Sequence, residues 1–243
     1  MRKIGIVFII LLSLFVYRAP YIHAIEIKDM IQRFLKEELP FKKGETLTYE
    51  VRYKKVKIGK SILTFHGEVA LGDKKVYHVT FFTKIPAFKD TEDLYAEKGT
   101  FVPIEVHRSI KKRIGFNDRI EEKYDQENFR VDIKSKSKLR TKSFSIEKDS
   151  KIHNAILLTY YCRTIENFEE NNPFNVTLPT LDFEVIYGGQ DTIETALGEQ
   201  LAHVFTSDPP KFKLWLSADE RRIPLRVENP STLGYALVIK SID

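Results

Sequence analysis

Closely spaced carboxylates are the side chains of this sequence that could most readily do chemistry. A pair held about 5 to 10 Å apart can hydrolyse a glycosidic bond. Charged residues near turns are usually solvated instead, so the pairs support hydrolysis of envelope glycan only as an alternative function. They comprise Asp90, Glu92 and Asp93, then Asp182 and Glu184, then Asp219 and Glu220.

Other catalytic patterns do not occur in the sequence. No serine has the G-x-S-x-G context of a nucleophile elbow, and Cys162 lies in an apolar run, where we expect a buried thiol. Gly59-Lys60-Ser61 resembles the end of a phosphate-binding loop, but Lys54 replaces the earlier glycine that such a loop needs. Metal sites need clustered donors. After residue 24 the histidines are scattered singly, as His66, His78, His107, His153 and His203. The sequence therefore predicts no catalytic residue, metal or cofactor.

A row of cations is the least usual pattern in the chain. Polar or apolar residues alternate with Lys134, Lys136, Lys138, Arg140 and Lys142. Period two predicts a strand with all five cations on one face, where they could bind phosphate head groups or another polyanion. The alternative is an edge strand that lysines protect against pairing with another sheet.

Aromatic residues suggest a second kind of site. The chain has 17 Phe and 11 Tyr, many of them in the first predicted strands. Large rings can fill the interior of a β-structure, but a small barrel can also hold one apolar ligand. Our candidates for lining such a cavity are Tyr49, Tyr53, Phe65, Phe81 and Trp215.

The N-terminus has the three regions of an export signal. Arg2 and Lys3 precede an apolar stretch, and a segment ending in Ala24 follows it. The apolar stretch is shorter than the roughly 20 residues of a transmembrane helix. We therefore predict that residues 1–24 are removed and that the protein is periplasmic. The alternative is an uncleaved N-terminus that anchors it in the membrane.

The net charge argues against a nucleic-acid partner. Three of the 39 Lys and Arg lie in residues 1–24, which leaves 36 against 34 acidic residues and a charge of +2. The basicity of the whole chain is mostly a feature of the export signal. We expect at most peripheral membrane contact.

The rest of the sequence predicts a mainly β protein. Residues 25–43 favour a short amphipathic helix and its lead-in, with apolar residues at helical spacing before Pro40. From residue 44 to 243 about a dozen segments with period-two alternation follow, interrupted by one apolar helix that Asn154 can cap. We expect a single domain built as a strongly curved antiparallel sheet or open barrel closed over that buried helix.

Three segments together resemble a known family. They are Gly44-Glu45-Thr46-Leu47-Thr48-Tyr49 with Ile58-Gly59-Lys60-Ser61, the helix ending Leu158-Thr159-Tyr160-Tyr161-Cys162-Arg163-Thr164, and Leu214-Trp215-Leu216-Ser217-Ala218-Asp219-Glu220-Arg221-Arg222-Ile223-Pro224. They are similar to an exported bacterial family catalogued as domain of unknown function 3108. This resemblance implies an envelope protein with a curved antiparallel sheet, and it supplies no catalytic residues.

The last of these segments also has a structural interpretation. We expect Trp215 on the inner face of the sheet, a turn at Asp219-Glu220, and an ion pair between Arg221 or Arg222 and a carboxylate there.

These observations favour a non-catalytic protein that binds an apolar or lipid-like ligand or an envelope partner. Glycan hydrolysis by an acid pair is one alternative. The other is a structural or assembly factor that binds another protein through an edge of its sheet.

Overall fold

The computed structural model describes residues 39–243, apart from residues 55, 166, 170–171 and 231–233. The chain separates into the units Met1–Leu39 and Pro40–Asp243, and the second is described by itself. The expected export signal and most of the expected helix in residues 25–43 lie outside the described residues. No helix in the part that the structure describes is long and apolar enough to cross a membrane.

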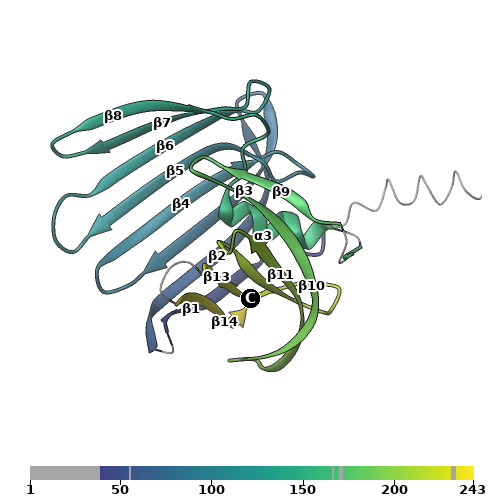
Figure 1. Cartoon of the computed structure of the whole chain (residues 1–243). Coiled ribbons are helices and arrows are strands. Elements are labelled where there is room, and N and C mark those ends of the chain that lie inside the picture. Colours follow the sequence, from purple (N-terminus) through teal and green to yellow (C-terminus); the bar gives the residue numbers. More distant parts are fainter. Residues whose placement is uncertain (1–38, 55, 166, 170–171, 231–233) are drawn as a thin grey trace, which may run out of the picture. The chain divides into compact units, whose positions relative to one another are not determined.

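The second unit is mainly β, as predicted, with fourteen strands among its described residues (Figure 1). In β1 the residues Leu47, Tyr49 and Val51 are buried and alternate with more exposed neighbours, which is the period-two pattern that predicted this strand. The strands are β1 (Thr46–Tyr53), β2 (Val56–Leu71), β3 (Lys74–Lys84), β4 (Phe88–Ala96), β5 (Pro103–Lys112), β6 (Asp118–Asp125), β7 (Arg130–Ser137), β8 (Thr141–Glu147), β9 (Phe174–Leu178), β10 (Leu181–Thr195), β11 (Gly198–Asp208), β12 (Lys213–Ser217), β13 (Pro224–Glu228) and β14 (Tyr235–Ile242).

All fourteen strands belong to one antiparallel sheet. Its order is β8-β7-β6-β5-β4-β3-β2-β1-β14-β13-β12-β11-β10-β9, so strands that follow each other in the chain lie side by side, except β8 and β9, and β1 also pairs with β14. Strands β8 and β9 form the two edges and do not pair with each other, so the sheet is open. The first and last strands thus meet in the middle of the sheet.

Helix α3 (Ala155–Thr164) connects the two edge strands. The side-chain oxygen of Asn154 accepts hydrogen bonds from the backbone nitrogens of Ile156 at 2.9 Å and Leu157 at 3.3 Å. These bonds satisfy amide groups that the first turn of a helix leaves free. The predicted cap and the predicted burial of Cys162, which is 0% exposed, are both confirmed.

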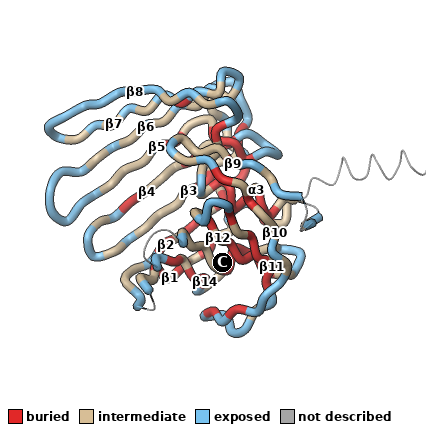
Figure 2. Tube along the Cα trace, in the orientation of Figure 1, coloured by how far each residue is buried: buried red, intermediate tan, exposed pale blue. Residues whose placement is uncertain are grey.

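Helix α3 contacts both halves of the sheet. Tyr160 packs against Phe41, Phe65 of β2 and Phe101, with ring centroids 4.9, 5.7 and 5.6 Å away. Leu158 and Cys162 belong to a cluster with residues from β9 to β12 that includes Leu214. Figure 2 shows the buried residues gathered around this helix.

Alternation along each strand defines two faces of the sheet. We call the face that carries Phe65 and Leu214 the helix face, because these residues pack with or around α3. We call the other face the outer face, and it carries Lys60 and Lys84, which lie opposite each other on β2 and β3.

Candidate functional site

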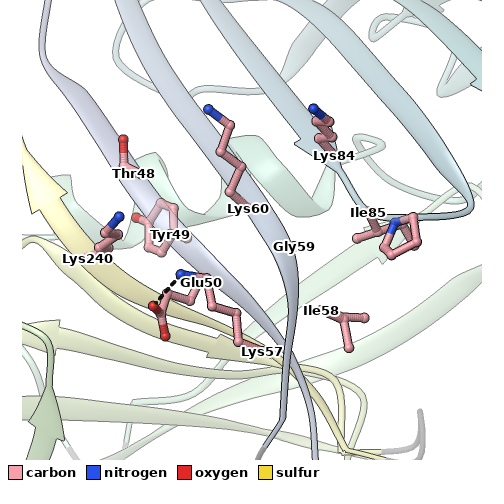
Figure 3. A pocket seen from close by; sticks show the side chains of 11 residues that line it. Thr48, Tyr49, Glu50, Lys57, Ile58, Gly59, Lys60, Lys84, Ile85 and Lys240 are labelled. Atoms are coloured by element: carbon pink, nitrogen blue, oxygen red, sulfur yellow. Dashed lines mark hydrogen bonds and ion pairs between the residues drawn. The ribbon is translucent and has the colours of Figure 1, made fainter.

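A pocket of about 410 Å³ lies where the β1–β2 and β3–β4 connections come together (Figure 3). Its lining combines ammonium groups with apolar side chains, and we call it the lysine pocket. The charged lining is Lys57, Lys60, Lys84, Lys240 and Glu50, and the apolar lining includes Ile58, Ile85 and Pro86. Such a mixture suits a ligand that has an anionic group next to an apolar one.

Glu50 neutralises part of this charge. Its carboxylate lies 2.8 Å from Lys57 Nζ and 2.9 Å from Arg52 Nη2. The hydrogen bonds from Lys57 and Arg52 lower the pKa of Glu50, so it stays ionised. Within the described part of the chain, Lys60, Lys84 and Lys240 have no ion pair, which leaves them available to an anion.

The lysines of the pocket continue across the outer face. Lys60 lies directly opposite Lys84, Lys84 opposite Lys89, and Lys89 opposite Lys111. Like charges that face each other across strands destabilise a sheet. A row of four cations on neighbouring strands is therefore more consistent with anion binding than with stability.

Gly59 permits the close approach of the β3–β4 connection to β2. A Cβ atom at this position would lie 2.2 Å from the carbonyl oxygen of Lys84 and 2.7 Å from Ile85 Cγ2. Any larger residue would have to displace that backbone. The Gly59-Lys60-Ser61 segment thus lies on strand β2 rather than in a phosphate-binding loop, and its glycine shapes the lysine pocket.

A charged cluster lies on the helix face between β4, β5 and β6. Arg108 donates to Asp90, with Nη2 2.5 Å and Nε 3.0 Å from Oδ2, and its Nε lies 3.5 Å from Glu92 Oε1. Tyr124 donates to Glu122 beside them. The pKa of Glu92 is raised from 4.5 to about 7, mainly by burial, with smaller contributions from the charges of Asp90 and Glu122 and against the lowering effect of Arg108.

The remaining predicted acid groups do not form buried pairs. Asp93 points to the outer face and accepts from His78 and Thr80. Asp182 pairs with Lys148 at 2.9 Å, and Asp219 pairs with Arg221 at 3.0 Å in the predicted turn. Asp90 and Glu92 are thus the acid pair that the fold buries, and the carboxylate of Asp90 is already bound by Arg108.

Histidines that are scattered in the sequence meet on the outer face. The rings of His66 and His78 stack with centroids 4.4 Å apart, and Tyr95 stacks on His78 at 4.8 Å. Cross-strand pairing of β2, β3 and β4 brings them together, which no spacing within one strand could indicate. Among the described residues, no group of three or more His, Cys, Asp or Glu is placed to hold a metal.

The predicted cationic row does not occupy one face of one strand. The chain turns at residues 138–140, where Ser137 N donates to Arg140 O at 2.8 Å, and residues 141–147 form the separate strand β8. Lys142 lies opposite Ser135, so it points to the other face from Lys134 and Lys136. The prediction was wrong because period-two alternation continues through a short hairpin loop, and the edge strand is β8.

The five aromatic candidates are not gathered around one cavity. Tyr49 and Phe65 are 1% and 3% exposed and belong to the core. Phe81 lies on the helix face opposite Glu92, and the ring of Tyr53 contacts that of Tyr235 at a tilt of 46° at the end of β1.

The prediction that Trp215 lies on the inner face of the sheet was wrong. Trp215 alternates with Leu214 and Leu216, which pack around α3, so it lies on the outer face rather than the inner one. It is nevertheless buried, with Lys213 Nζ and the Arg226 guanidinium over its ring at 4.4 and 5.2 Å. Neighbouring cations, which strand alternation alone does not reveal, cover this ring.

The three segments that carry the family resemblance meet in a buried ion-pair network. Arg163 of α3 is 0% exposed and donates to both carboxylate oxygens of Glu45, at 2.6 and 2.9 Å. It also donates to the backbone oxygen of Arg221 at 3.0 Å. The hydroxyl of Ser217 accepts a hydrogen bond from the backbone nitrogen of Ile223 at 2.7 Å and donates one to Asp219. These contacts link α3 to the segment before β1 and to the turn after β12.

Among three comparisons with known proteins, the family match agrees with the resemblance. No curated protein matches the chain. Among solved structures, a β-barrel-like protein of domain of unknown function DUF1849 from Brucella abortus is similar at 10% identity and a TM-score of 0.49, covering 82% of this chain and 97% of that one. The family described as Protein of unknown function (DUF3108) matches residues 48–240. Because this match spans most of the sequence, the chain belongs to that family.

Proposed function

We propose that this is an exported, non-catalytic protein of the bacterial envelope that binds an anionic, lipid-like ligand in the lysine pocket. The composition of that pocket carries the proposal. Lys60, Lys84 and Lys240 have no partner carboxylate in the described part of the chain, and apolar side chains lie beside them. A phosphate group with an attached acyl chain meets both requirements.

The architecture supports a binding role. We infer that the sheet curves around α3, since the helix contacts both halves of it. Of the aromatic residues that could have lined an internal cavity, Tyr49 and Phe65 are buried in the core instead, and Trp215 lies on the outer face. We therefore assign ligand binding to the lysine pocket, beside the β1–β2 and β3–β4 connections.

One observation favours the alternative of glycan hydrolysis. Glu92 has a pKa of about 7 and lies near the ionised pair of Asp90 and Arg108. A carboxyl group that is protonated near neutral pH can act as a general acid. Because Arg108 already binds Asp90 through two nitrogens, the second carboxylate is not free to attack a sugar or activate water.

The test is binding of dihexanoylphosphatidylglycerol below its micelle concentration, measured by calorimetry on protein exported by its host. The double variant Lys60→Gln, Lys84→Gln is expected to bind about 100-fold more weakly, because two charge-assisted hydrogen bonds are lost. The matched control is Lys89→Gln, Lys111→Gln, which removes equal charge from the same row outside the pocket.

Equal losses in both variants would contradict a specific pocket. If the native protein binds no lipid and instead retains an envelope protein on purification, the assembly-factor alternative replaces the proposal.

A further inference from the structure

Four hairpin connections lie side by side at one end of the strands. This side of the sheet is distinct from the edge strands β8 and β9. In an antiparallel meander successive connections alternate between the two ends of the strands. The β1–β2, β3–β4, β5–β6 and β7–β8 connections therefore share one edge, which we call the hairpin edge (Figure 1). The β2–β3, β4–β5 and β6–β7 connections share the opposite edge.

The two edges differ sharply in charge. On the hairpin edge, the described residues 53–54, 56–57, 84–89, 111–118 and 136–142 contain eleven Lys or Arg and one acidic residue. On the opposite edge, residues 71–75, 96–102 and 125–130 contain four of each sign. The small net charge of the protein thus conceals a strongly cationic edge.

Exposed apolar side chains lie at the tips of the same hairpins. Val56 is 66% exposed, Ile114 is 88% exposed and Leu139 is 76% exposed. Together with Phe116, these residues make up four of the eight large hydrophobic residues that are exposed in the described part of the chain. Figure 2 shows the connections at the ends of β5 to β8 as exposed. Exposed apolar residues on three hairpin connections of the same edge favour a surface that is covered by a partner.

Neighbouring tips contact one another. Lys138 Nζ of the β7–β8 connection lies 5.6 Å from the centre of the Phe116 ring. This contact links the β7–β8 and β5–β6 connections. A second pocket, of about 490 Å³, lies between the β3–β4 and β5–β6 connections and is lined by residues that include Arg113 and Ile114. Cations and apolar groups therefore alternate along the whole edge.

We propose that the hairpin edge docks onto an anionic lipid bilayer. Val56, Ile114 and Leu139 enter the headgroup region, and the flanking Lys and Arg side chains bind lipid phosphates. This combination of apolar tips and cations is what a bilayer interface recognises. A second copy of the same edge would be repelled by its charge, and a nucleic acid would leave the aliphatic tips without a role.

This proposal goes beyond ligand binding in the lysine pocket and does not depend on it. The pocket lies between the first two hairpins of the edge. A docked protein would hold its pocket next to the lipid headgroups from which a lipid-like ligand comes.

Vesicle co-sedimentation of the exported full chain tests the proposal. Phosphatidylcholine vesicles are compared with vesicles that also contain phosphatidylglycerol, because an inserted N-terminus would bind both alike. The triple variant Arg113→Gln, Lys138→Gln, Arg140→Gln is expected to lose about 100-fold in affinity for the anionic vesicles, at about five-fold for each cation. The control Lys74→Gln, Lys75→Gln, Lys151→Gln removes equal charge from the opposite edge and is expected to bind as the native protein does.

A second variant tests the apolar tips. Ile114→Ser, Leu139→Ser should lose about ten-fold in vesicle affinity and keep its fold, because both residues are exposed. It should also keep its affinity for dihexanoylphosphatidylglycerol, since neither residue lines the lysine pocket, and this separates the two proposals. Absence of a preference for anionic vesicles, or an equal loss in the opposite-edge control, would overturn membrane docking. If the serine variant binds anionic vesicles as tightly as the native protein does, the apolar tips do not contribute, and the hairpin edge is instead a site for a soluble polyanion.

Discussion

Glu92 shows how a single residue acquires properties that its neighbours in the sequence do not indicate. It lies two residues after Asp90 on the same face of β4, and nothing in the sequence distinguishes either from an ordinary acid. In the folded protein, β5 and β6 bring Arg108 and Glu122 beside them. The buried surroundings raise the pKa of Glu92 to about 7.

This pKa has a consequence for stability. Between pH 4.5 and 7, Glu92 keeps its proton in the folded protein and loses it in the unfolded chain. The folded state then binds more protons, so the free energy of unfolding falls as pH rises through this window, by about 3 kcal/mol at most. In Glu92→Gln this part of the decrease is expected to vanish, as measured by urea denaturation across the window. The control is Glu121→Gln, an exposed carboxyl on the other face of the sheet, in β6. A decrease of unchanged size in Glu92→Gln would show that its carboxyl ionises normally.

At the scale of the elements, the hairpins determine where charge gathers. The sequence pattern predicted a single strand through residues 134–142, but a loop at residues 138–140 divides it. That loop joins three others on the hairpin edge, so cations that are remote in the chain become neighbours. The position of Gly59 has a comparable effect, because it lets the β3–β4 connection lie against β2 and form the lysine pocket.

Gly59→Ala is expected to destabilise the protein by about 1 to 3 kcal/mol, because the new methyl group overlaps the backbone oxygen of Lys84. The same displacement should weaken lipid binding in the pocket. Urea denaturation and calorimetry measure the two effects. Gly188→Ala is the matched control, since the nearest atom to its Cβ would be Val204 O at 3.7 Å. Native stability in Gly59→Ala would mean that the β3–β4 connection moves aside without cost.

At the scale of the whole molecule, the network around Arg163 joins parts of the chain that are far apart. Glu45 precedes β1, Arg163 lies near the end of α3, and Arg221 follows β12. The guanidinium is fully buried, and Phe41 lies 4.4 Å from it. Breaking a buried ion pair is costly because the remaining charge has no partner.

Arg163→Gln is therefore expected to reduce the free energy of unfolding by about 3 to 5 kcal/mol, since it leaves the Glu45 carboxylate buried and unpaired. Equilibrium unfolding in urea, followed by circular dichroism, measures the change. Arg221→Gln provides the comparison, because its pair with Asp219 is exposed and should contribute about 1 kcal/mol or less. If the two variants lose the same stability, the buried network is not what holds the helix to the sheet.

The sequence by itself determined the mainly β class, the capped and buried helix, the burial of Cys162 and the family, because alternation, capping and motifs are local properties of the chain. The turn at Asp219 and its ion pair with Arg221 were predictable for the same reason. Only the tertiary structure decided that Lys60, Lys84 and Lys240 share a pocket, that Trp215 lies on the outer face and that four cationic hairpins share one edge. These features depend on strand order and register, which contacts between distant segments establish and which no local pattern encodes.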